Sequence, residues 1–91
     1  MQTTMDYEVN VFVFNKLRSS QTCSEQDAPH LFARAARDIM STREEHMSAR
    51  FESTKHFISF ANPHMSVMMM GHITRDLLAI TMKEVKYALM D

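Results

Sequence analysis

The chain has 91 residues, with ten Lys and Arg against eleven Asp and Glu and a formal net charge of -1. This length fits one small domain whose core is too limited for a large buried active site. The near-neutral charge excludes a long-range field that would steer the protein to nucleic acid or to an anionic membrane. We therefore expect a single α+β domain over residues 1–91, with residues 1–4 disordered.

The residue usage also bears on where the protein resides. No apolar run approaches the roughly 20 residues of a membrane-spanning helix, and the first residues lack the basic and apolar regions of a secretory signal. Cys23 is the only cysteine, so no disulfide can form within the chain. A lone cysteine in a polar stretch fits a reducing compartment. The expected location is the cytoplasm.

The first predicted element is a strand over residues 7–14, because apolar side chains recur there at every second position. One face of this strand carries Tyr7, Val9, Val11 and Val13. The other face becomes aromatic at Phe12 and Phe14, which predicts a place in the middle of a sheet. Residues 15–26 are rich in Ser, Thr, Gln and Asn and are predicted to form a loop.

A helix is predicted over residues 27–47. Ser24 or Asp27 can cap its start, and Pro29 is tolerated in a first turn. An apolar stripe at helical spacing supports the assignment. Its members are Ala28, Phe32, Ala35, Ala36, Ile39, Met40 and Met47.

Residues 49–61 fit two structures. As a helix they would extend the preceding apolar stripe, whereas their Phe, Ile, Ser and Thr content favours a strand, which we prefer. Residues 62–65 suit a type I turn, with Asn first and Pro second, and lead to an apolar run over residues 67–70. Two apolar runs around a tight turn predict a hairpin.

The last predicted element is a helix that reaches about residue 90. Gly71 is expected to end the preceding strand, and Thr74 is a good N-cap. Ile73 and Leu78 have the spacing of a hydrophobic staple. One helix face is expected to carry Leu78, Met82, Val85 and Leu89.

The expected fold is a three-stranded mixed sheet with two helices packed on one face, in the order β-α-β-β-α. A crossover through the first helix would make the first two strands parallel. This element order and length resemble the DNA-damage-inducible RecA-regulator (DinI-like) family. In that family the second helix is strongly acidic, whereas here Arg75, Lys83 and Lys86 accompany Asp76, Glu84 and Asp91. The resemblance therefore concerns the fold alone.

No catalytic or metal-binding motif stands out. Five histidines are present, but no two have the i,i+3 or i,i+4 spacing of helical metal ligands. In the expected fold, His56 and His72 could approach each other. The single glycine excludes a phosphate-cradling loop. We expect no metal, no cofactor and no enzymatic activity.

Methionine is the unusual feature, with ten in the chain and four of them within residues 65–70. If both helices cover one face of the sheet, alternate residues must form an open apolar face, which monomers seldom expose. The predicted partner-binding residues are Phe12, Phe14, Met68 and Met70. The alternative is that the fold differs and the methionines belong to the core.

The resulting hypothesis is a small regulatory or inhibitory protein that binds another protein and forms a homodimer through its sheet. Short chains of this kind are common in phages and mobile elements. This expectation is general and does not come from particular residues of the sequence. The alternative function is single-stranded nucleic-acid binding, because aromatic side chains on a sheet rimmed by cations can stack bases. The residues for that alternative are Lys16, Arg18, Lys55 and Phe57.

Overall fold

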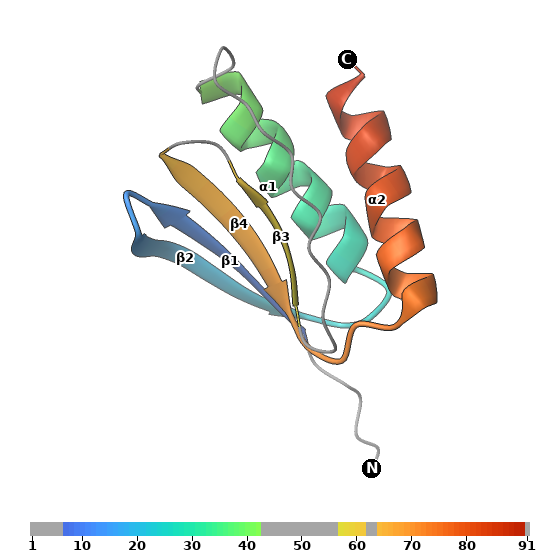
Figure 1. Ribbon diagram of the computed structural model, residues 1–91. Coiled ribbons are helices and arrows are strands. Elements are labelled where there is room, and N and C mark those ends of the chain that lie inside the picture. Colours follow the sequence, from blue (N-terminus) through green and yellow to red (C-terminus); the bar gives the residue numbers. More distant parts are fainter. Residues whose placement is uncertain (1–6, 43–56, 62–63, 91) are drawn as a thin grey trace.

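The computed structural model describes residues 7–42, 57–61 and 64–90 (Figure 1). In chain order the elements are β1 (Tyr7–Val13), β2 (Lys16–Cys23), α1 (Ala28–Thr42), β3 (Phe57–Ala61), β4 (Met65–Met70) and α2 (Arg75–Leu89). The four strands form an antiparallel sheet in the order β2-β1-β4-β3. Both helices lie on the same side of this sheet (Figure 1).

This architecture confirms the α+β class and corrects the predicted sheet. The sheet has four strands and not three, and every strand pair is antiparallel. The order is β-β-α-β-β-α, so the likeness in element order to the RecA-regulator family does not hold. Two features account for these differences: a strand follows β1 where a loop was expected, and β4, not β3, lies next to β1 in the sheet.

β1 is an inner strand, as predicted, with β2 on one side and β4 on the other. Its alternate residues Tyr7 and Val9 face the helices and are buried at 2% and 4% exposure. Val11 and Val13 continue the same face and are half-buried. The period-two pattern of the sequence therefore identified both the strand and its covered face.

β2 was missed because it is exposed along nearly its whole length. A strand with solvent on both faces has no apolar alternation to mark it, and Leu17 is the only large apolar residue before Cys23. Phe14 and Asn15, with φ of 52° and 67°, form the two-residue turn between β1 and β2. Positive φ at both central residues is the signature of a type I′ hairpin turn, whose usual sequence signal, Asn-Gly, is absent here.

α1 begins where the capping signals indicated. The Leu31 amide donates to the Asp27 carbonyl at 3.0 Å, and the Asp27 amide donates to the Ser24 carbonyl at 3.2 Å. Pro29 lies in the first turn. The buried face contains Ala28, Phe32, Ala33, Ala36 and Ile39. α1 ends at Thr42 within the described part of the chain, and the remainder of the predicted helix, residues 43–47, lies outside it.

The ambiguous middle segment is a strand where it is described, because β3 covers residues 57–61. Residues 49–56 and the first two residues of the predicted turn, 62 and 63, lie outside the described residues. β3 and β4 pair antiparallel, which confirms the predicted hairpin. β4 begins at Met65, two residues earlier than expected.

Gly71 ends β4 as predicted, and the structure supplies the reason. Its φ of 151° is in the region that favours glycine, and a Cβ added there would overlap the ring of Tyr7. The Tyr7 hydroxyl donates to the His72 carbonyl at 3.0 Å. The start of β1 is thus fixed against the connection that leads from β4 to α2.

α2 has the predicted N-cap, since the Leu77 amide donates to the Thr74 hydroxyl oxygen at 3.1 Å. Its buried residues are Leu77, Thr81 and Val85, so the buried stripe is rotated away from Met82, which is 40% exposed. α2 packs mainly on α1, which in turn lies against β4, β1 and β3. His30 Nδ1 and Glu84 Oε1, 3.3 Å apart, link the two helices at the surface.

Candidate functional site

The face of the sheet opposite the helices is the first candidate. The strand registers arrange its side chains in three rows across β2, β1, β4 and β3. The rows are Leu17, Phe12, Ser66 and Ala61; Ser20, Asn10, Met68 and Ser59; and Thr22, Glu8, Met70 and Phe57. Half of these twelve side chains are apolar, and Glu8 is the one charged member of the face as described.

Three of the four predicted partner-binding residues lie together on this open face. Phe12 and Met68 are diagonal neighbours on adjacent strands, and Met70 follows along the same strand. Phe12 and Met68 are half-buried, while Met70 is 40% exposed. Phe14 is not part of the face, because it occupies the β1–β2 turn. Leu17, at 57% exposure, extends the apolar surface where the sequence predicted a loop.

The methionines divide between the two alternatives considered for them. Met69 faces the helices and is fully buried in the core, whereas Met68 and Met70 face the other way. Met65 is half-buried on the helix side and lines a cavity. The alternation of β4 therefore places some methionines in the core and leaves two on the open face.

The residues proposed for nucleic-acid binding are not brought together. Lys16 and Arg18 belong to β2 and Phe57 to β3, the two outer strands of the sheet. Three strand spacings, about 14 Å, separate these strands. Lys55 lies outside the described residues. No continuous row of aromatic and basic side chains is formed by the described members of this set.

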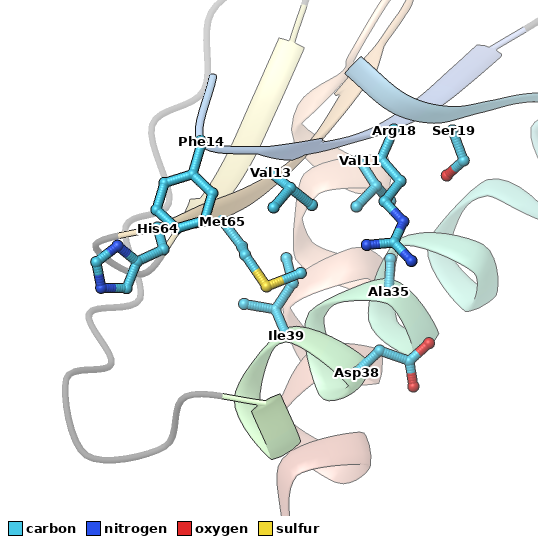
Figure 2. A pocket seen from close by; sticks show the side chains of 10 residues that line it. All are labelled: Val11, Val13, Phe14, Arg18, Ser19, Ala35, Asp38, Ile39, His64 and Met65. Atoms are coloured by element: carbon cyan, nitrogen blue, oxygen red, sulfur yellow. The ribbon is translucent and has the colours of Figure 1, made fainter. Parts of the chain in front are cut away.

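A cavity of about 650 Å³ on the helix side of the sheet is the second candidate (Figure 2). It lies between the end of the β1–β2 hairpin, the start of β4 and the middle of α1. Its apolar lining consists of Val11, Val13, Ala35, Ile39 and Met65. This volume is within the range of small-molecule sites, roughly 300–1,000 Å³. The cavity exists because α1 covers β1 and β4, while β2 extends beyond the helix.

One end of the cavity is polar. The register of β1 and β2 shifts between Val11 and Phe12, which leaves Arg18 as an extra residue between Ser19 and Leu17. Such a bulge re-aims side chains, and here both Arg18 and Ser19 line the cavity. Figure 2 shows the Arg18 guanidinium extending toward α1, where Asp38 lines the opposite wall. A cation and a carboxylate therefore face the same space from different elements.

The other end of the cavity is aromatic. The rings of Phe14 and His64 lie with their centroids 5.2 Å apart at an interplanar angle of 50°. The Phe14 amide also donates to the His64 carbonyl at 2.7 Å, which ties the hairpin turn to the start of β4. Figure 2 shows this pair at the far side of Val13 and Met65 from Arg18. The cavity is therefore amphipathic along its length.

Sequence reasoning did not find this cavity, since it depends on β2, which was expected to be a loop. Phe14, Arg18 and His64 come together only through the β1–β2 turn, the bulge and the start of β4. The available signal was the pair Phe14-Asn15, because Asn tolerates positive φ and apolar residues lie on both sides of it.

Tyr7 lies at the start of β1, against the connection from β4 to α2. Burial raises the pKa of the Tyr7 hydroxyl, with a smaller contribution from the Glu25 carboxylate. The burial of Tyr7 is explained by its contacts with Gly71 and His72. In the described ranges, no three His, Cys, Asp or Glu side chains are grouped so that they could hold a metal ion. His56, half of the histidine pair considered above, lies outside those ranges.

Comparison with protein-family models, with curated proteins and with solved structures finds no match to this chain. Among the described residues, no helix is both long enough and apolar enough to cross a membrane. The open face and the cavity are the two candidate sites of the described residues.

Proposed function

We propose that this chain is a small non-catalytic regulatory or inhibitory protein that acts by binding protein, with a second copy of itself bound on the open face of the sheet. The carrying observation is that both helices lie on one side of the sheet (Figure 1). The strand registers then place four apolar side chains on the other side: Phe12, Leu17, Met68 and Met70. Contiguous apolar surface that a small domain leaves uncovered often marks an interaction site.

The charge of the face favours a second copy over a charged partner. Glu8 is the one charged side chain among the described residues of this face, so little there would attract an oppositely charged protein. Glu8 lies in the row at one end, and Phe12 lies in the row at the other. A two-fold axis that runs across the strands would stack each Glu8 row on the partner's Phe12 row and keep the two carboxylates apart.

The size of the open face determines how strong a dimer we expect. Four strands and about six residues per strand give a planar footprint of roughly 400 Å². Stable interfaces bury about 800 Å² per partner. We therefore expect a dimer with a dissociation constant in the micromolar range. A larger apolar target could displace one copy of the chain from the other.

Light scattering across protein concentration tests the dimer. The wild-type mass should rise from monomer to dimer, with little change between about 50 mM and 500 mM salt, because an apolar contact is weakly screened. The variant Phe12→Thr/Met68→Thr should remain a monomer at every concentration. A wild-type chain that stays monomeric, or a double variant that still dimerises, would refute the proposed interface.

A matched pair of single variants guards against a folding defect. Met70 on the open face and Met82 on α2 are both 40% exposed, so Met70→Thr and Met82→Thr remove the same side chain at the same exposure. Only Met70→Thr should weaken dimerisation, by about tenfold if one apolar contact is lost. Equal effects of the two variants would contradict a contact through the sheet.

A further inference from the structure

We infer that the cavity between the β1–β2 hairpin and α1 binds a small apolar zwitterion, a molecule with an amino-acid head group and a large apolar side chain. The inference is independent of the dimer, since the cavity lies on the helix side of the sheet. Its basis is the order of groups along the cavity: charged at one end, apolar in the middle and aromatic at the other end.

The charged end has the chemistry of an amino-acid head group. Arg18 provides planar donors suited to a carboxylate, and Ser19, the next residue along β2, also lines the cavity. Asp38, from the opposite wall, can accept from an ammonium, because a carboxylate has acceptor positions for several donors. A purely anionic ligand would meet Asp38, and a purely cationic one would meet Arg18. A ligand with both charges avoids either repulsion.

The conformation of β2 supports a binding role for Arg18. An exposed arginine on a regular strand would follow the alternation of its neighbours, whereas the bulge directs Arg18 and Ser19 to the same side. Among the described residues, no carboxylate lies within ion-pair distance of the Arg18 guanidinium. Its donors are therefore available to a ligand carboxylate.

The remaining lining defines the other half of the ligand. Val13, Ile39 and Met65 form an apolar middle, which excludes a polar side chain without partners. The Phe14 and His64 rings line the far end, where an aromatic ligand group could pack on them in an offset or edge-to-face arrangement. A phenylalanine-like ligand satisfies both ends, and L-phenylalanine is the natural probe.

Three probes with the same phenyl group separate the contributions. L-Phenylalanine carries both charges, 3-phenylpropanoate only the carboxylate, and 2-phenylethylamine only the ammonium. Titrations followed by backbone amide NMR shifts should place binding at Val11, Val13, Ala35 and Ile39. We expect L-phenylalanine to bind about five- to tenfold more tightly than either analogue, since each charged contact is partly exposed. Equal binding of all three probes, or no shifts at these residues, would overturn the inference.

Variants test whether Arg18 is the partner of the ligand carboxylate. Arg18→Gln should weaken L-phenylalanine binding, because the partner of the ligand carboxylate is lost, and should not weaken 2-phenylethylamine binding, because a cationic probe loses only repulsion. Arg34→Gln is the matched control, because Arg34 is also exposed but does not line the cavity. Ala35→Leu fills the space and should abolish binding of all three probes. If Arg18→Gln weakened the carboxylate-free probe equally, the assigned role of Arg18 would be wrong.

Discussion

The two faces of the sheet are built from the same strands and differ in what covers them. On the helix side Ile58, Phe60, Val67 and Met69 are fully buried. On the open side Phe12 and Met68 are half-buried, and Met70 is 40% exposed. Consecutive residues of β4 therefore have opposite roles. Met69 on the covered face packs in the core beneath the helices, whereas Met68 and Met70 on the open face do not.

The two hairpins differ in how far α1 covers them. β3 and β4 contribute buried residues because α1 lies against both, whereas β2 lies beyond the helix and is exposed at seven of its eight positions. β2 is held by its pairing with β1 and not by packing. β2 places Leu17 on the open face and Arg18 at the cavity.

The largest loss of stability is expected where the covered face closes at Gly71. Gly71→Ala would push a Cβ into the Tyr7 ring at a φ of 151°, and should lower the free energy of unfolding by about 3 kcal/mol or more. Thermal or denaturant unfolding measures this effect. The neighbouring exposed residue provides the control, since His72→Ala should change stability by less than about 0.5 kcal/mol. Similar losses of unfolding free energy in both variants would mean that the contact between Gly71 and the Tyr7 ring is not the cause.

Adjacent methionines offer the most direct test of the two faces. Met69→Ala empties a fully buried position and should cost about 2–5 kcal/mol. Met68→Ala removes the same side chain from the open face and should cost less than about 1 kcal/mol in the monomer while weakening the dimer. Denaturant unfolding at protein concentrations below the dissociation constant of the dimer separates the two effects. Equal costs would mean that β4 does not divide its side chains as described.

The smallest expected effect concerns pH at the edge of the covered face. Burial raises the pKa of Tyr7, so the folded state disfavours the phenolate more than the unfolded state does. This contribution to stability is complete below the unfolded pKa of about 10 and is lost as pH rises through the folded pKa. Unfolding measured from neutral to alkaline pH should show a decline that Tyr7→Phe removes.

At neutral pH, Tyr7→Phe should itself cost about 1 kcal/mol, because the hydrogen bond to the His72 carbonyl is lost. Tyr87→Phe is the control, since Tyr87 is 59% exposed on α2. That variant should keep both the neutral stability and the alkaline decline. An unchanged alkaline decline in Tyr7→Phe would assign it to another group.

The sequence by itself determined the elements that bury one face. Alternating valines identified β1, the helical stripe from Ala28 to Ile39 identified α1, and Gly71 and Thr74 marked the boundary before α2. These patterns are local, because burial on one side repeats at the period of the backbone. The open-face positions of Phe12, Met68 and Met70 followed from the same alternation once both helices were expected on one side.

Only the tertiary structure decided the sheet order, the strand β2 and the cavity. An exposed strand is held by hydrogen bonds to its neighbour, and backbone hydrogen bonds leave no pattern in the side chains. The bulge that directs Arg18, and the approach of Phe14 to His64, depend on pairings between residues distant in the chain. Periodicity reports which side of an element is covered, whereas the partner that covers it is set by how the whole chain packs.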